Sequence, residues 1–116
     1  MSKRDVRFFI RDMLEAIEKV ERYTGGLSLE TFRANDMVID AVVRNLEIIG
    51  EAARQIPEDL RDRYPGVEWR RVVGFRNIVI HAYFDVDVDI VWVIATQRLD
   101  ALKRVLEQML TDLGEG

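Results

Sequence analysis

Apolar residues in the first part of the chain recur at every third or fourth position, which is the spacing of one face of an α-helix. This stripe lies between Ser2, which can cap a helix together with Asp5, and the stop signal Gly25-Gly26. The sequence therefore predicts a first helix over residues 3–24. Its inward face is predicted to consist of Val6, Phe9, Ile10, Met13, Leu14, Ile17 and Val20.

A second apolar stripe follows and is interrupted by polar residues near its start. Ser28 is a candidate cap, and the polar stretch 33–36 predicts a kink or break before a longer helix over residues 37–56. Pro57 suits the first turn of a short helix over residues 57–64, which the turn at Pro65-Gly66 would end.

A third long helix is predicted to begin near Val67, and its inward face carries a charge. Arg76 falls on that face, and burying a lone charge is costly, so Arg76 needs an anionic partner. A ligand phosphate could supply the negative charge, and so could Glu47 or Glu51 of the preceding helix. The apolar members of the same face are Trp69, Val72, Val73, Ile80 and Tyr83.

Acidic and apolar residues alternate over residues 85–90 with the period of a strand, but the sequence offers no partner strand. We therefore predict that Asp85 or Asp87 caps a last helix that ends near Leu113. The whole pattern predicts an all-α fold, an up-and-down four-helix bundle with a short extra helix, in a single domain over residues 1–116. The long helices could leave apolar surface for a partner helix.

Charge and composition narrow the classes of function. The net charge of −4 argues against a protein that grips nucleic acid over a wide basic face. No stretch approaches the run of about 18 apolar residues that a membrane span needs, so no membrane association is expected. The chain has no cysteine, which excludes disulfides and thiolate metal sites. We expect a cytoplasmic protein.

The candidate chemistry centres on His81, which is the only histidine. A single histidine usually has no catalytic role, so the residues around His81 must show whether this one does. His81 follows Arg76 by five positions, and on a regular helix the two side chains would point about 140° apart. They can share a pocket only if the helix ends or bends near His81. Tyr83 returns to the Arg76 face, where an aromatic packed on the core is the simplest interpretation.

Residues 76–83, with the sequence Arg-Asn-Ile-Val-Ile-His-Ala-Tyr, resemble the Arg-x4-His-x-Tyr motif of HEPN domains in the HepT-like ribonuclease toxin family. The Gly-Glu-Ala element at residues 50–52 and the order of the helices resemble the same family. The resemblance covers nearly the whole chain, and the combination is more specific than the Arg-to-His motif alone.

The resemblance implies a metal-independent endoribonuclease that needs no cofactor, in which the 2′-hydroxyl of RNA attacks the adjacent phosphate. His81 would transfer protons, Arg76 would stabilise the charge on phosphorus, and Asn77 would support them by orienting the phosphate or the imidazole ring. It also implies a homodimer with two Arg76–His81 pairs in one cleft. The implied partner is a minimal nucleotidyltransferase antitoxin that adds AMP to Tyr83.

Two alternatives stay open. A non-catalytic HEPN subunit of a two-protein nucleotidyltransferase would use Arg76 to bind a nucleotide or its partner chain. A plain helical interaction protein would need Arg76 only as the salt-bridge partner of Glu51. The sequence leaves Glu51 as either that partner or an exposed charge, and it leaves Asn45 as a core amide in the simplest interpretation.

Overall fold

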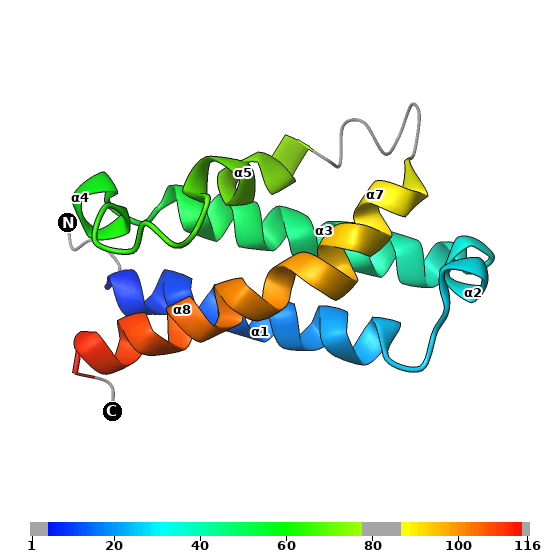
Figure 1. Ribbon diagram of the computed structural model, residues 1–116, viewed down its shortest axis with the longest axis horizontal. Coiled ribbons are helices and arrows are strands. Elements are labelled where there is room, and N and C mark those ends of the chain that lie inside the picture. The colour runs from blue at the N-terminus through cyan, green and yellow to red at the C-terminus, as the bar shows by residue number, and fades with distance from the viewer. Residues whose placement is uncertain (1–4, 78–86, 115–116) are drawn as a thin grey trace.

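The computed structural model describes residues 5–77 and 87–114, and in those ranges the regular elements are all helical, which confirms the predicted all-α bundle (Figure 1). The elements are α1 (Val6–Thr24), α2 (Leu29–Arg33), α3 (Asp36–Arg54), α4 (Glu58–Arg61), α5 (Trp69–Val73), the 3-10 turn η1 (Gly74–Asn77), α7 (Val88–Val93), the π-turn η2 (Ile94–Arg98) and α8 (Leu99–Asp112).

The two long helices α1 and α3 lie side by side and antiparallel, and they form the base of the bundle (Figure 1). Helix α8 packs on α1, whereas α5 and η1 pack on α3. The core between these helices is apolar, and its burial drives the assembly. Side chains with no exposed surface include Ile10, Met13, Ile17, Val20, Val42, Leu46, Ile49, Leu106 and Met109.

The first helix begins later than predicted and ends where predicted. Asp5 is itself the cap, because its carboxylate accepts a hydrogen bond from the Arg7 backbone N–H at 2.9 Å, and the helix starts at Val6. The expected cap Ser2 lies outside the described residues. At the other end Gly26 has a φ of +78°, a backbone conformation that glycine adopts without strain.

The predicted break at residues 33–36 is confirmed. Helix α2 ends at Arg33, and Asn35 caps α3 by accepting a hydrogen bond from the Val38 backbone N–H at 3.1 Å. The short helix expected over residues 57–64 is shorter in the structure, since Pro57 precedes α4 as its cap residue and α4 ends at Arg61.

The third helix is not the long regular helix that its periodicity predicted. In the part of this helix that the structure describes, residues 69–73 are α-helical and residues 74–77 tighten into the 3-10 turn η1. The change of helix type coincides with a close backbone contact to α3, described below. Residues 78–86, including the candidate cap Asp85, lie outside the described part of the chain.

The last helix confirms one of the two predicted caps. Asp87 accepts a hydrogen bond from the Ile90 backbone N–H at 3.2 Å, and α7 begins at Val88. The π-turn η2 then interrupts the helix, which the sequence did not predict, before α8 continues to Asp112. None of the helices in the described ranges is long and apolar enough to cross a membrane.

Candidate functional site

The backbones of α5 and η1 come close to helix α3 at Gly50. An ideal Cβ atom placed on Gly50 would lie 2.7 Å from the Arg76 backbone nitrogen, 3.0 Å from the Val73 carbonyl oxygen and 3.2 Å from the Val72 carbonyl oxygen. All three are backbone atoms, which cannot rotate out of the way as a flexible side chain can. Glycine at position 50 therefore lets the backbone of Arg76 lie directly against α3.

Arg76 pairs with Glu51, the residue that follows this contact. The Arg76 Nε atom lies 2.8 Å from Glu51 Oε1, and the two side chains are 37% and 43% exposed. The sequence left a ligand phosphate, Glu47 and Glu51 as candidate anionic partners, and the structure places Glu51 beside Arg76. The other carboxylate oxygen of Glu51 lies 3.9 Å from Arg54 Nη1, so this longer contact is the weaker of the two.

Arg76 lies at the edge of the core and not inside it. Trp69 and Val72 of the predicted stripe are buried, whereas Arg76 is half-buried. Trp69 is fixed by its Nε1–H group, which donates a hydrogen bond to the Tyr64 carbonyl oxygen at 3.0 Å. Asn77, the predicted supporting residue, is exposed at the end of η1. Arg76 therefore follows a segment that is packed in the core, and its own side chain remains partly exposed to solvent.

The two other predicted site residues, His81 and Tyr83, lie outside the described residues. Their grouping with Arg76 stays a prediction. The rule of about 100° per residue, which placed Arg76 and His81 on different faces, assumes a regular α-helix. It already fails at Arg76, because η1 is a 3-10 turn.

Asn45 is a satisfied core amide, as its simplest interpretation held. Its side chain is 5% exposed, and its Nδ2 group donates a hydrogen bond to the Ala41 carbonyl oxygen at 2.8 Å.

The residue that sequence reasoning missed is Gly50, which it noted only as part of a family-like element. A glycine inside a 19-residue helix costs about 1 kcal/mol relative to alanine, and that cost was the available signal of a close contact.

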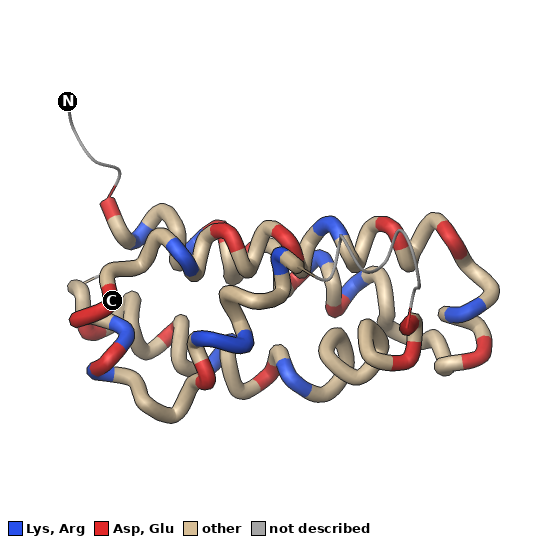
Figure 2. Tube along the Cα trace, turned by 90° about the horizontal axis from the view of Figure 1, so that it is seen from above, with Lys and Arg blue, Asp and Glu red and all other residues tan. Residues whose placement is uncertain are grey.

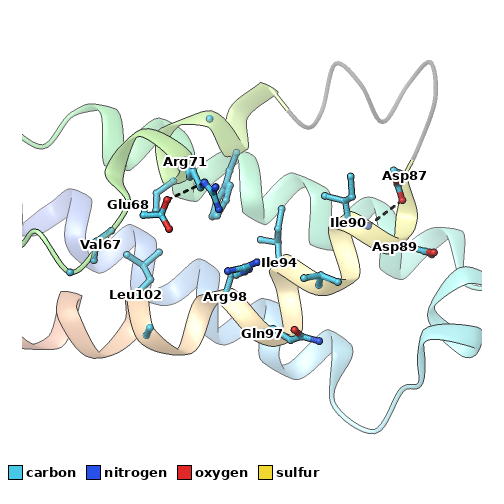
Figure 3. Close-up of a pocket in the computed structure, with 16 residues that line it drawn as sticks. Val67, Glu68, Arg71, Asp87, Asp89, Ile90, Ile94, Gln97, Arg98 and Leu102 are labelled. Carbon is cyan, nitrogen blue, oxygen red and sulfur yellow. Dashed lines mark hydrogen bonds and ion pairs between the residues drawn. The ribbon is translucent and has the colours of Figure 1, made fainter.

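A groove lies between α5 and the α7–α8 arm, is lined in part by Gly74 and Phe75 of η1, and has a volume of about 800 Å³ (Figure 3). Basic and acidic side chains both line the groove. Arg71 pairs with Glu68 at 3.1 Å, and Arg98 and Asp87 are also among the lining residues. The apolar side chains that line it include Val67, Val72, Phe75, Ile90, Ile94 and Leu102.

Basic and acidic residues are interspersed along the helices (Figure 2). Several of them form exposed pairs, such as Lys103 with Glu21 at 3.0 Å and Arg104 with Asp100 at 2.6 Å. A nucleic-acid ligand would therefore meet charges of both signs along the helices that the structure describes.

Comparison with known proteins gives a match of residues 13–109 to the family model described as Ribonuclease HepT-like. Two proteins of Methanocaldococcus jannaschii that carry provisional names as RNases are similar to the chain. One is 43% identical over 107 residues, covering 92% of this chain and 98% of that protein. The other is 37% identical over 113 residues, covering 97% and 93%.

A protein of Thermococcus cleftensis, named provisionally as a ribonuclease HepT, is 37% identical over 107 residues, which cover 92% of this chain and 97% of that protein. No solved structure matches the chain. The span matched by the family model contains Gly50, Glu51 and the whole stretch from Arg76 to Tyr83.

Proposed function

The chain belongs to the HepT-like ribonuclease family, and we propose that it is a metal-independent endoribonuclease toxin of the cytoplasm that cleaves RNA with Arg76 and His81. The observation that supports this most is the placement of Arg76. Its backbone is fixed by the Gly50 contact, its Nε atom is held by Glu51, and its side chain remains 37% exposed five residues before the only histidine.

The proposed reaction is an internal transesterification. The RNA 2′-oxygen bonds to the adjacent phosphorus, the bond from phosphorus to the 5′-oxygen breaks, and a 2′,3′-cyclic phosphate remains. A base takes the proton of the 2′-hydroxyl, and an acid gives a proton to the departing 5′-oxygen. An imidazole can act as either base or acid, so His81 can fill either role, while Arg76 stabilises the charge that builds up on the phosphoryl oxygens. Asn77 would orient the phosphate or the imidazole ring.

The need for both an acid and a base supports a homodimer, since each chain has one histidine. A two-fold axis would bring two Arg76–His81 pairs to one cleft. The dimer can be tested by measuring the mass of the protein in solution. Dilution below the dimer's dissociation constant should abolish cleavage, whereas a monomer that cleaves with undiminished specific activity would contradict the shared site.

We also propose that a minimal nucleotidyltransferase antitoxin neutralises the protein by adding AMP to Tyr83. The tyrosine oxygen would bond to the α-phosphorus of ATP, and pyrophosphate would leave. The added phosphate would compete with RNA for the Arg76 guanidinium. Intact mass of the protein co-expressed with its antitoxin, compared with a Tyr83→Phe variant, tests this step.

The Arg76–Glu51 pair also fits a second candidate function, a non-catalytic HEPN subunit that binds a nucleotide or a partner chain of a two-protein nucleotidyltransferase. In that case His81 has only a structural role. The experiment that separates the two is RNA cleavage in EDTA by protein freed of antitoxin, beside His81→Ala at matched thermal stability. Loss of cleavage in the variant supports the ribonuclease, and inactivity of both proteins with an unmodified Tyr83 supports the binding subunit.

A further inference from the structure

We infer that Glu51 is a positioning residue for Arg76, which holds the guanidinium by its Nε edge and leaves the two Nη nitrogens to bind the RNA phosphate. This inference rests on the proposed function and adds to it a role for a residue of another helix. A guanidinium has five N–H donors in a planar fork, so one edge can be engaged by a carboxylate while the other binds a phosphate.

The contacts of Arg76 fit that division. Its Nε atom lies 2.8 Å from Glu51 Oε1, and this is the only ion pair that Arg76 makes with the residues the structure describes. Both side chains are more than a third exposed, so the pair contributes little to the free energy of folding. The fold should therefore be nearly as stable without the Glu51 side chain.

The backbone beneath the pair removes the freedom that weakens most surface pairs. The Arg76 backbone nitrogen lies so near Gly50 that a Cβ atom placed on Gly50 would be only 2.7 Å from it. Glu51 is the next residue of α3. The two side chains therefore start from backbones that are fixed relative to each other, so ordering them costs less side-chain entropy than for a pair on mobile segments. Such a pair restricts where the guanidinium can lie.

The sign of the charge on Glu51 makes the inference testable. A carboxylate beside the RNA site repels the phosphate backbone, so removing it should tighten RNA binding if Glu51 has no other role. If Glu51 positions Arg76, its removal should slow the chemical step, because misplacing a catalytic group by about 1 Å can cost on the order of 100-fold in rate. Binding and turnover should then change in opposite directions.

The experiment compares Glu51→Ala, Glu51→Gln and the control Glu47→Ala, each with single-turnover cleavage of a short RNA and with affinity for the same RNA bearing a 2′-deoxy group at the cleaved position. Glu47 is one helical turn earlier on α3, is half-buried like Glu51, and has no ion pair with Arg76 in the structure. Glu47→Ala removes the same charge from nearly the same place and leaves the Arg76 contact intact.

We expect Glu51→Ala to lower the single-turnover rate by about 10- to 100-fold with equal or tighter RNA binding. Glu51→Gln should recover part of the rate, since its amide oxygen carries a partial negative charge and can lie at the same place beside Arg76 Nε, and Glu47→Ala should cleave at the wild-type rate.

Two outcomes would overturn the positioning role. The first is a single-turnover rate for Glu51→Ala within twofold of wild type, which would leave the ribonuclease function standing. An equal loss in Glu47→Ala would also overturn it, because charge alone would then explain the effect. A wild-type protein that does not cleave RNA would end both proposals, and a Glu51→Ala variant that fails to fold leaves Glu51→Gln to decide between the same outcomes.

Discussion

Replacing Gly50 with alanine tests whether the backbone contact between α3 and η1 fixes Arg76. The added methyl group would meet the Arg76 nitrogen at 2.7 Å, and ordinary contacts with a Cβ atom begin at 3.4 Å, so η1 must move away by about 0.7 Å. The Val73 and Val72 carbonyl oxygens, at 3.0 and 3.2 Å, resist the same methyl group. The strain is therefore spread over three backbone atoms, which cannot avoid the methyl group by a change of side-chain rotamer.

Two effects of opposite sign set the magnitude. Overpacking of this kind costs about 1–3 kcal/mol, and alanine gains about 1 kcal/mol over glycine in a helix interior. Because the opposing atoms are all backbone, we expect overpacking to win and the free energy of unfolding to fall by about 1–2 kcal/mol, which corresponds to a loss of about 4–10 °C in Tm. A displaced Arg76 should also lower RNA cleavage by about tenfold or more.

The assay is thermal and urea unfolding of Gly50→Ala beside Gly74→Ala. Gly74 is the matched control, since it lies at the end of α5 with helical angles of −65° and −13° and no atom within 4 Å of its Cβ position. Gly74→Ala should leave the stability unchanged or raise it by about 0.4–1 kcal/mol. Helix propensity acting alone would stabilise Gly50→Ala as well, so a variant at least as stable as wild type would refute the packing argument.

Three further predictions concern contacts outside the site. Asp87→Ala should lower the free energy of unfolding by about 1 kcal/mol in urea, since it removes the α7 cap; an unchanged value would show that the cap is dispensable. Tyr64 donates to Asp112 at 2.6 Å and holds the pKa of that carboxyl below 3.8, so the contact stabilises the fold above pH 4 and is lost as the pH falls through the lowered pKa. Tyr64→Phe should therefore cost more stability at pH 7 than at pH 2, and an equal cost would contradict the assignment. The exposed pair Arg33–Asp89 should show a small coupling in a double-mutant cycle that vanishes in 1 M salt, whereas a salt-insensitive coupling would mean a less exposed contact.

Side-chain periodicity predicted the parts of the fold that depend on which residues face the core. The end of α1, the break before α3 and the cap at Asp87 all follow from apolar spacing and capping chemistry. The same reasoning predicted that Arg76, on an inward face, would need an anionic partner, and it left a ligand phosphate, Glu47 and Glu51 as the candidates. The structure selected Glu51 because the Gly50 contact brings η1 against that turn of α3.

Periodicity could not predict features that depend on how two backbones approach each other. The 3-10 turn at Gly74–Asn77 and the π-turn at Ile94–Arg98 change the number of residues per turn without changing which residues are apolar. The role of Gly50 was hidden for the same reason, since it is defined by the backbone of another element. The joint placement of Arg76 and His81 stays a prediction.

Cleavage of one defined RNA in EDTA tests the central claim most directly, with the products identified by mass and with His81→Ala and Arg76→Ala at matched stability beside the wild type. We expect a 2′,3′-cyclic phosphate end from the wild type, no product from either variant, and no cleavage where a single 2′-hydroxyl is replaced by hydrogen. Cleavage by His81→Ala at the wild-type rate, or cleavage at the 2′-deoxy position, would contradict it.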